Sequence, residues 1–456
     1  MSYNNKTEIH IGSEFNELNI SDKDSDIDHE NCYKPESSPY TLWCEECAPN
    51  CIIEGWSSGN NDVDEFIKNT IYDARKDYHD GNDFYPLFLE WVPFDRFEDI
   101  KQIGEGGFAK VYSAIWIDGK AKYFKQNNGN WKKREPEPIK VALKKLNESY
   151  IISADYSNEI KTLWNVYVND ETYLKFYGIT KNPETKEFIM IIELANQGNL
   201  RSVLSSDFNK LLWKDKLRFL VGISLDLKKL HQLGCFHKDL HSGNILQNCN
   251  EYGKRSVSYV SDFGLSGPSN KKKSDDKIYG VLPYIAPESL NRKPYTLSSD
   301  VYSFGVIMTE LSSGIPPFYE RKHDDILALA ICNGIRPEFG KGTPEIYKKL
   351  AYRCMNANPD QRPTARELYD VLKFWCDSCE DNIYSQEKCG YKGKEIRNIF
   401  NEINKEILNI STSYEKNPDA IYTSRIFTFS NLPKPINSSI ITSYLNEEDN
   451  KDSQDS

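Results

Sequence analysis

The spacing of hydrophobic residues changes along the chain and predicts both helices and strands. From residue 61 to about residue 78, apolar positions recur every three or four residues, as on one face of an amphipathic helix. They are Val63, Phe66, Ile67, Ile71 and Ala74. Asn61 or Asp62 is the expected N-cap. We expect this helix to pack on the following domain, which is commoner for such a face than binding a partner protein.

A buried strand and a long helix are predicted farther along the chain. Residues 188–195 are apolar almost throughout, as in an ordinary core strand. Leucine and isoleucine then recur at helical spacing from Leu211 to Leu230, and Gly234 follows as a stop signal. Residues 118–138 contain Asn-Asn-Gly-Asn and Pro-Glu-Pro, which predict an extended hairpin loop inserted between strands.

Both ends of the chain are rich in Asn, Ser and charged residues. Such segments cannot bury enough apolar surface to offset the entropy lost on ordering. We therefore expect residues 1–60, a Cys-containing segment, to be disordered, and residues 376–456 to form a largely disordered tail. Within that tail, residues 395–410 have the pattern of one helix.

The charge, the hydrophobic runs and the cysteine content indicate which classes of protein this chain is not expected to belong to. A net charge of −11 argues against general affinity for nucleic acid, which requires a basic surface. No apolar run approaches the roughly 18 residues that span a bilayer, and the start lacks the apolar core of a secretory signal. Eleven cysteines, an odd number, fit reduced thiols. We expect a cytoplasmic protein, with a nuclear location as the alternative.

Four cysteines near the start could hold a metal ion. Cys44 and Cys47 are two residues apart, and Cys32 and Cys51 flank them, so four thiolates could bind one tetrahedral Zn²⁺. Only one half of the usual paired spacing is intact, and free cysteines are the favoured alternative. A second group, Cys376, Cys379 and Cys389, lacks a fourth ligand cluster and is a weaker candidate.

The strongest chemical pattern lies in the middle of the chain. Asp239 and Asn244 are five positions apart in His-Lys-Asp-Leu-His-Ser-Gly-Asn, and Asp262 precedes Phe-Gly downstream. Phosphoryl transfer needs one carboxylate to accept a hydroxyl proton and further oxygens to hold Mg²⁺ against phosphates. An isolated Asp in a loop is more often a turn former, but three matching positions make that explanation a poor one.

Upstream residues complete this pattern. The run Ile-Gly-Glu-Gly-Gly-Phe-Ala over residues 103–109 lets backbone amides approach phosphate oxygens without side-chain obstruction. Lys144 ends the apolar strand Val-Ala-Leu-Lys, and Glu159 lies on a predicted helix whose apolar face includes Tyr156, Ile160 and Leu163. A lysine at a strand end is usually solvated, and a partner carboxylate such as Glu159 is needed to give it a function.

Together these motifs resemble those of the eukaryotic protein kinases, and most closely the tyrosine-kinase-like group, of a fungal Ser/Thr type. The same order continues with Ala-Pro-Glu at residues 286–288, Asp300 and Arg362, so the resemblance covers residues 97–375. It implies an α+β, bilobal protein kinase fold with disordered termini and with MgATP in the cleft. The expected N-lobe, residues 97–194, is β-rich with five strands and one helix. The expected C-lobe, residues 195–375, is mainly helical, and residues 61–96 are a helical N-terminal extension.

The resemblance also implies a role for each motif residue. Asp239 is the catalytic carboxylate, Lys144 binds the α- and β-phosphates, and Glu159 orients Lys144. Asn244 and Asp262 are the expected ligands of Mg²⁺ or Mn²⁺. The expected ATP-binding residues are Ile103, Gly104, Glu105, Gly106, Gly107, Phe108, Ala109, Val111, Ala142, Lys144, Glu193, Ala195 and Leu246. Ile192 is the expected gatekeeper, and Ala109 replaces the third glycine that is usual in the family.

The class of protein substrate is left open by the same comparison of motifs. His241 and Val281 stand where Ser/Thr kinases usually have Lys and Thr, and the Tyr-kinase loop is not matched either. We favour Ser/Thr, with dual-specificity or Tyr kinase, or a pseudokinase scaffold acting as a binding module, as alternatives. Autophosphorylation or an upstream kinase would act on loop residues Ser266, Ser269, Ser274 or Tyr279. Lys238 replaces the usual Arg, which weakens the expected grip on such a phosphate.

Overall fold

A computed structural model provides the fold. It describes residues 41–42, 52–53, 55–76, 87–106, 109–125, 131–146, 154–168, 174–249, 256–268, 277–380, 387–388, 390–405 and 414–449. In this part of the chain the helices are α2 (Asn61–Lys76), α3 (Ala154–Val168), α4 (Leu200–Asp207), α5 (Trp213–Gln232), α6 (Pro287–Leu290), α7 (Leu297–Ser313), α8 (Asp325–Cys332), α9 (Glu345–Cys354), α10 (Ala365–Cys379), α11 (Gly393–Ile403) and α12 (Ser439–Asp449). The strands are β1 (Thr41–Leu42), β2 (Glu90–Trp91), β3 (Phe97–Glu105), β4 (Ala109–Trp116), β5 (Tyr123–Lys125), β6 (Trp131–Lys133), β7 (Ile139–Leu146), β8 (Phe176–Lys181), β9 (Phe188–Glu193), β10 (Cys235–Phe236), β11 (Ile245–Cys249), β12 (Ser256–Val260), β13 (Gly267–Pro268), β14 (Ile278–Gly280), β15 (Glu387–Lys388), β16 (Tyr391–Lys392) and β17 (Arg425–Phe427).

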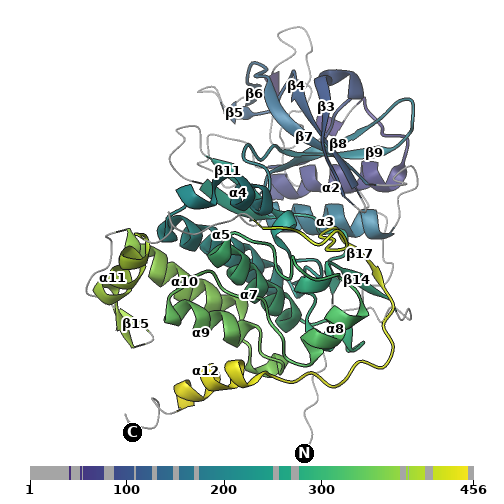
Figure 1. Ribbon diagram of the computed structural model, residues 1–456. Coiled ribbons are helices and arrows are strands. Elements are labelled where there is room, and N and C mark those ends of the chain that lie inside the picture. Colours follow the sequence, from purple (N-terminus) through teal and green to yellow (C-terminus); the bar gives the residue numbers. More distant parts are fainter. Residues whose placement is uncertain are drawn as a thin grey trace, which may run out of the picture.

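These elements form two lobes, one built on a sheet and one mainly helical, as the α+β expectation requires (Figure 1). The sheet of the first lobe has six strands in the order β2-β8-β9-β7-β4-β3. Within residues 97–194 this sheet has the five expected strands, β3, β4, β7, β8 and β9, and the short strand β2 of the N-terminal extension adds a sixth through a parallel pairing to β8. The one helix expected in this lobe is α3, and α2 of the N-terminal extension contributes to the same hydrophobic core against the sheet.

The central strand β9 is apolar throughout because both faces of the sheet are covered. Its residues Phe188, Met190 and Ile192 belong to the large core that includes α2 and α3. Ile189 and Ile191 point the other way, into a smaller core with Phe97, Trp116 and other residues of the opposite face. Alternate residues of a strand face opposite sides, so a strand with two covered faces loses the polar alternation.

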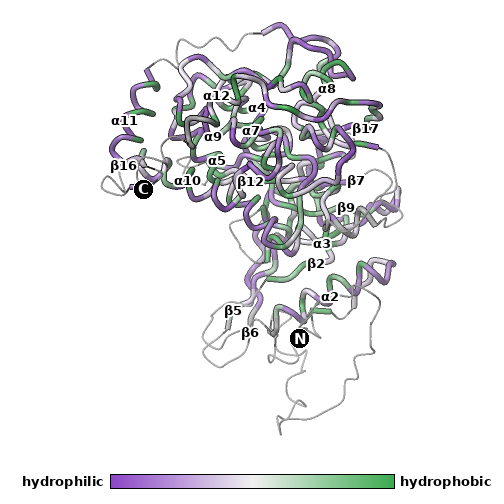
Figure 2. Tube along the Cα trace, turned by 90° about the horizontal axis from the view of Figure 1, so that it is seen from below, coloured by the Kyte–Doolittle hydropathy of each residue, from purple (hydrophilic) through white to green (hydrophobic). Residues whose placement is uncertain are grey.

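The helix predicted from residue 61 is α2, and its apolar stripe is buried as expected. Val63, Ile67, Ile71 and Ala74 are at most 4% exposed. Figure 2 shows hydrophobic and hydrophilic residues mixed along α2, as this one-sided burial requires. The N-cap is Asn60, not Asn61 or Asp62, because its side-chain oxygen accepts from the Val63 amide at 3.1 Å.

The polar insertion over residues 118–138 contains the antiparallel hairpin β5–β6, as predicted. The distant strand β1 pairs with β6 and makes this a small three-stranded sheet. Figure 2 shows the hairpin projecting away from the helical lobe.

The helical lobe is organised around α7, which is buried on all sides from Ser299 to Ser312. α5, α9 and the short strand β10 pack on α7, and α10 packs on the α5 helix (Figure 1). Thr296 and Ser299 form a capping box at the start of α7, and Gly314 ends it in the left-handed conformation. In the described part of the chain, no helix is both long and apolar enough to cross a bilayer.

The expectation of a largely disordered tail over residues 376–456 fails for the described parts of that range. Helix α11 packs beside α10 and α5, and the expected helix over 395–410 is this one. Residues 414–449, which we call the C-terminal segment, run along the helical lobe to α12 (Figure 1). Ala420, Phe427, Phe429 and Ile441 are buried there, so scattered apolar side chains find sites on the lobe despite the polar composition.

Candidate functional site

Lys144 lies between two carboxylates contributed by different elements. Its Nζ is 2.5 Å from Oε1 of Glu159 on α3 and 3.0 Å from Oδ1 of Asp262. Lys144 is on β7 in register with Met190, which fixes its place in the centre of the sheet. The side chains of Lys144 and Glu159 are 9% and 2% exposed. The pairing expected from the sequence is therefore present, and Asp262 shares the same ammonium group.

Burial and charge act in opposite directions on these three groups. Burial opposes the positive charge of Lys144, but Asp262 and Glu159 together outweigh it and raise the pKa of the ammonium group. For Glu159, burial is the larger effect and raises the pKa of the carboxyl despite Lys144. For Asp262, the attraction of Lys144 outweighs burial and lowers the pKa. Asp262 is thus the more firmly ionised of the two acids.

The Phe-Gly that follows Asp262 lets the backbone pass close to Glu159. A Cβ added to Gly264 would lie 3.2 Å from Oε2 of Glu159 and 3.5 Å from Oδ1 of Asp262. Oε2 of Glu159 is buried and has no hydrogen-bond partner among the described residues. The cluster therefore holds one carboxylate oxygen that is desolvated but not satisfied.

Asp300 at the start of α7 fixes the loop that carries Asp239. Its carboxylate accepts the backbone amides of His237 at 2.8 Å and Lys238 at 3.1 Å, and Lys238 has a left-handed φ of 69°. It also accepts from Tyr295 Oη and His231 Nε2. Burial opposes the charge of Asp300, but the bonds from its donors outweigh this and lower its pKa. The loop conformation is thus held by a buried, ionised anchor.

His237 connects this loop to the strand end before Asp262. Its Nδ1 accepts the Asp239 amide at 3.3 Å, so the proton of the neutral ring lies on Nε2, which donates to the Ser261 carbonyl at 2.9 Å. Burial lowers the pKa of the imidazole, which favours this neutral form. The His237 ring also packs 5.4 Å from that of Phe263, centroid to centroid. These contacts therefore fix the position of the Asp239 loop relative to the segment that carries Asp262.

Asn244 is oriented by the same loop. Its amide nitrogen donates to the backbone carbonyl of Asp239 at 3.0 Å and lies 3.5 Å from Oδ2 of Asp239. Because the nitrogen is directed at Asp239, Oδ1 is the Asn244 atom that can serve as a ligand. Asp262 adds an ionised carboxylate, so the donor set is oxygen only, which suits Mg²⁺ or Mn²⁺.

The first of the expected ATP-binding residues lie where the edge strand β3 turns into β4. Gly104 pairs with Val111 across β3 and β4, and the Gly106 amide donates to the Ala109 carbonyl at 2.8 Å to close the turn. Ile103 is 54% exposed, and Glu105 forms an exposed ion pair with Lys110 at 3.3 Å. Gly107 and Phe108 lie outside the described residues.

The expected adenine end of the site follows β9. Buried Ala142 pairs in register with Ile192, the expected gatekeeper, which is 6% exposed. The Glu193 carboxylate accepts from Asn248 Nδ2 at 3.2 Å, so its side chain ties this segment to β11. Leu246 of β11 bridges Asn199, and Gly198 donates its amide toward the Ala195 carbonyl at 3.4 Å. The two lobes are thus joined around Ala195.

Glu288 and Arg362 form a buried pair in the helical lobe. Two parallel bonds of 2.7 Å join the guanidinium to the carboxylate. Arg362 also donates to the carbonyls of Asn356 and Ser298, and Glu288 also accepts from Ser299 Oγ at 3.0 Å. This is the pairing that the sequence motif predicts, and every polar atom named here has a partner.

The expected loop phosphosites differ in accessibility. Ser266 is buried and donates to the His237 carbonyl at 3.3 Å. Tyr279 lies on β14, opposite Ile426 of β17. Ser269 and Ser274 lie outside the described residues, as do Cys32, Cys44, Cys47, Cys51 and Cys389. No cluster of three or more His, Cys, Asp or Glu fit to hold a metal occurs among the described residues.

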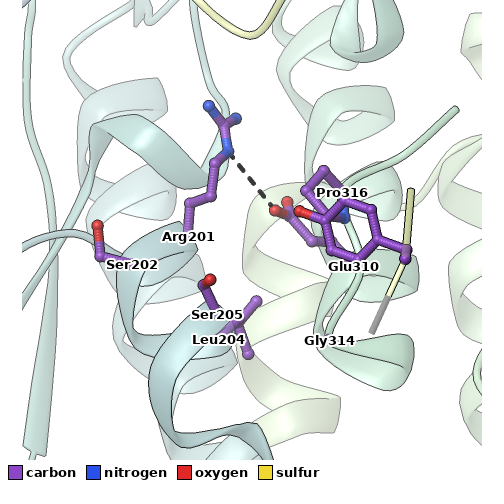
Figure 3. A pocket seen from close by; sticks show the side chains of 8 residues that line it. Arg201, Ser202, Leu204, Ser205, Glu310, Gly314 and Pro316 are labelled. Atoms are coloured by element: carbon purple, nitrogen blue, oxygen red, sulfur yellow. Dashed lines mark ion pairs between the residues drawn. The ribbon is translucent and has the colours of Figure 1, made fainter. Parts of the chain in front are cut away.

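Sequence reasoning missed Ser424, whose hydroxyl donates to Oδ2 of Asp239. It lies 185 residues downstream in a polar segment, and its surroundings have no motif that could have revealed it. Sequence reasoning also missed Arg201 of α4, whose guanidinium points toward Glu310 of α7 at 3.7 Å (Figure 3). Arg201 and Glu310 line a cavity of about 380 Å³ that Tyr414 of the C-terminal segment also borders.

Comparison with known proteins agrees with this geometry. The family described as protein tyrosine and serine/threonine kinase matches residues 97–372. A probable serine/threonine-protein kinase of Dictyostelium discoideum is 27% identical over 274 residues, 59% of this chain and 15% of that protein. A wall-associated receptor kinase-like protein of Arabidopsis thaliana is 28% identical over 320 residues, 63% of this chain and 36% of that protein.

A probable LIM domain-containing serine/threonine-protein kinase of Dictyostelium discoideum is 29% identical over 228 residues, 50% of this chain and 23% of that protein. The chain therefore spans well under half the length of each of these three relatives. Their sources are an amoeba and a plant, which gives no support to the expected fungal type.

Proposed function

This chain belongs to the protein tyrosine and serine/threonine kinase family, and we propose that it transfers the γ-phosphoryl group of ATP to Ser or Thr hydroxyls of proteins. A role in intracellular signalling is part of the proposal. The observation that carries it is the position of Lys144, held between Glu159 and Asp262 at 2.5 and 3.0 Å. That arrangement supports a site prepared for phosphates, because it fixes one cation beside one metal-binding carboxylate.

Each residue of the site has a task in this reaction. Lys144 would bind the α- and β-phosphates, and Glu159 would keep it there. Asp262 and the Oδ1 atom of Asn244 would hold Mg²⁺, which when bound neutralises charge on the phosphate oxygens. Asp239 would orient the substrate hydroxyl and accept its proton. The amides of residues 104–109 would enclose the phosphates, and the backbone at Glu193 and Ala195 would bind adenine.

The choice of Ser and Thr as acceptors draws on the relatives, whose names in two of the three cases are serine/threonine-protein kinases. His241 stands two positions after Asp239, where Lys is usual in such enzymes. Its Nδ1 accepts the Gly243 amide at 3.1 Å, so the neutral ring carries its proton on Nε2, which faces Oδ2 of Asp239 at 3.7 Å. An N–H donor is thus still directed at the catalytic carboxylate. Dual specificity is the alternative within this proposal.

The decisive experiment is transfer of labelled γ-phosphate from MgATP to a generic protein substrate, with Asp239→Asn as the control. We expect phosphoserine and phosphothreonine in the substrate, and a loss of about 10²–10⁴-fold in rate in the variant, the range for removing a general base. Phosphotyrosine in the substrate would instead support dual or Tyr specificity.

The rival function is a scaffold that uses the same fold for binding only. It predicts that the unmodified chain binds MgATP without turnover and that Asp239→Asn changes nothing. The intact set of Lys144, Asp239, Asn244 and Asp262 speaks against it, because a scaffold has no need of all four.

A further inference from the structure

The C-terminal segment crosses the face of the helical lobe at the catalytic loop. Its strand β17 pairs antiparallel with β14, with Phe427 opposite Ile278, Ile426 opposite Tyr279 and Arg425 opposite Gly280. Addition of an extended segment to an exposed strand edge is a common mode of peptide recognition. Here the added strand comes from the same chain, and the edge belongs to the segment between Asp262 and Glu288.

Side chains of the helical lobe hold the residues before Ser424. Arg201 donates to the Tyr422 carbonyl at 3.0 Å, and its guanidinium lies 4.8 Å from the centroid of the Tyr422 ring. The Tyr422 ring also meets His323 edge-on at 4.8 Å, and its hydroxyl donates to the Pro317 carbonyl at 2.9 Å. The backbone on this side of Ser424 is therefore fixed by specific contacts.

The residues after Ser424 are held equally well. Arg425 donates to the His323 carbonyl, and Arg292 donates to the Phe429 carbonyl at 2.5 Å. Phe427 and Phe429 stack at 5.3 Å between centroids and are 8% and 7% exposed. Ile426 and Thr428 are exposed, so this stretch turns alternate residues outward, and Thr423, just before Ser424, is exposed as well.

These anchors place the Ser424 hydroxyl at the catalytic carboxylate. Ser424 Oγ donates to Oδ2 of Asp239 and lies 3.5 Å from Nε2 of His241. Gly280, opposite Arg425, has a φ of 134°, and a Cβ there would lie 3.4 Å from Oδ1 of Asp239. Residues with a side chain rarely adopt this φ, so glycine is needed here for the backbone conformation beside Asp239.

From these contacts we infer that the C-terminal segment occupies the protein-substrate position and that Ser424 is a phosphoacceptor for the chain's own site. The inference rests on the proposed function. Ser424 Oγ bonds to the γ-phosphorus of ATP, and the bond from that phosphorus to the β–γ bridging oxygen breaks. ADP leaves with the electron pair, and the hydroxyl proton passes to Asp239. Any other protein substrate has to displace this segment first.

The test is time-resolved phosphosite mapping of the full-length, phosphatase-treated chain in MgATP, at two protein concentrations about 100-fold apart. We expect phosphate on Ser424 with a first-order rate constant equal at both concentrations, because donor site and acceptor belong to one molecule. The matched variants are Ser424→Ala, which should remove this phosphate, and Thr423→Ala, which should leave Ser424 phosphorylation unchanged.

Transfer between molecules is examined by mixing two full-length variants. The Asp239→Asn chain retains Ser424 as an acceptor, and the Ser424→Ala chain retains the catalytic residues. Transfer within one chain predicts no phosphate on Ser424 of the Asp239→Asn chain in this mixture. Phosphate there, or a rate proportional to protein concentration, would overturn the inference.

A generic protein substrate in the same reaction separates this inference from the function on which it rests. Phosphate on the added protein without phosphate on Ser424 would contradict the inference and leave the proposed function standing. If neither is phosphorylated, the proposed function fails and the inference fails with it.

Discussion

Two buried cations of this molecule pair with glutamates, and they do so in opposite ways. Arg362 is matched to Glu288 through two bonds of 2.7 Å, and the carbonyls of Asn356 and Ser298 accept two further N–H groups. Lys144 is shared between Glu159 and Asp262, and Oε2 of Glu159 has no hydrogen-bond partner among the described residues. Arg362 and Glu288 are 74 positions apart, whereas Lys144 and Glu159 are only 15 apart. Only the first pair has a partner for every polar atom.

The difference indicates what each pair does. A planar guanidinium and a carboxylate that satisfy one another fix a single geometry, which suits a structural link between α6 and the chain before α10. A lysine that is paired with two carboxylates can bind a phosphate in place of one of them, and its ammonium group stays paired with the other. The Lys144 cluster is therefore arranged for ligand binding, and the Arg362 pair for rigidity.

The largest expected effect comes from breaking the structural pair. Arg362→Met leaves Glu288 buried without its cation, and removing one partner of such a pair typically costs about 3–5 kcal/mol. We expect this loss in the free energy of unfolding, measured by urea titration of the full-length chain.

A surface pair of the same lobe provides the control for this loss. Arg353 and Glu367 are 3.8 Å apart and are 37% and 53% exposed. Arg353→Met should change the free energy of unfolding by less than about 1 kcal/mol, as is usual for exposed pairs. Equal losses in the two variants would show that burial does not distinguish these pairs.

The second prediction concerns the shared pair. Lys144→Met should lower the phosphorylation rate by about 10²–10³-fold, the size expected when one preorganised charge is lost from a developing transition state. Its effect on stability should be smaller than that of Arg362→Met, because Glu159, whose pKa is already raised by burial, can take up a proton and become neutral. Both readouts come from one preparation, by kinase assay and urea titration. A loss in the free energy of unfolding as large as that of Arg362→Met would show that the Lys144 pair is as important for stability as the Arg362 pair.

Both pairs could be predicted from the sequence alone, because each member lies in a motif with a known chemical role. Lys144 ends a strand of the sheet and Glu159 lies on the helix after it, so the fold brings them together once the family is recognised. The sixth strand was not predictable in this way. Residues 90–91 are too short to show a period, and their pairing to β8 depends on a Gly178 that leaves room for the Glu90 carbonyl.

The C-terminal segment shows where prediction from the sequence ends. Its composition is that of a disordered tail, and its order comes from contacts with residues more than 80 positions away, such as Arg201, Arg292 and His323. Such contacts leave no periodic pattern, because each side chain fits a separate site on a surface that is already folded. The Ser424–Asp239 contact therefore could not be expected from the sequence.

A third buried cation, Lys216, has no carboxylate partner in the part of the chain that the structure describes, and it gives the third prediction. Lys216 is fully buried, its Nζ has no hydrogen-bond partner among the described residues, and the Phe208 ring centroid lies 3.8 Å away. Burial lowers the pKa of its ammonium group to about 7, below the value of about 10.4 for an unfolded chain. Between about pH 7 and pH 10 the unfolded chain thus binds more protons, so stability should rise with pH in this window.

Lys216→Met isolates this contribution. The variant should be more stable than the parent chain near pH 7, by about 1–3 kcal/mol, because a desolvated donor without a bond is removed. It should also show a smaller rise in the free energy of unfolding between pH 7 and pH 10. A lower stability at pH 7 would mean that the aromatic rings around Lys216 compensate its burial through cation–π attraction.

The smallest expected effect tests how far the unsatisfied glutamate can move. Gly264→Ala would place a methyl group 3.2 Å from Oε2 of Glu159, closer than nearly all such contacts, so the carboxylate has to shift by a few tenths of an ångström. If Lys144 depends on the exact position of Glu159, the phosphorylation rate should fall by up to about tenfold, or ~1.4 kcal/mol in the barrier. Stability should change little, because Glu159 has no second bond to lose on that oxygen. A rate equal to that of the parent chain would show that the Lys144 cluster tolerates displacement, whereas a loss as large as for Lys144→Met would show that Gly264 is needed for more than space.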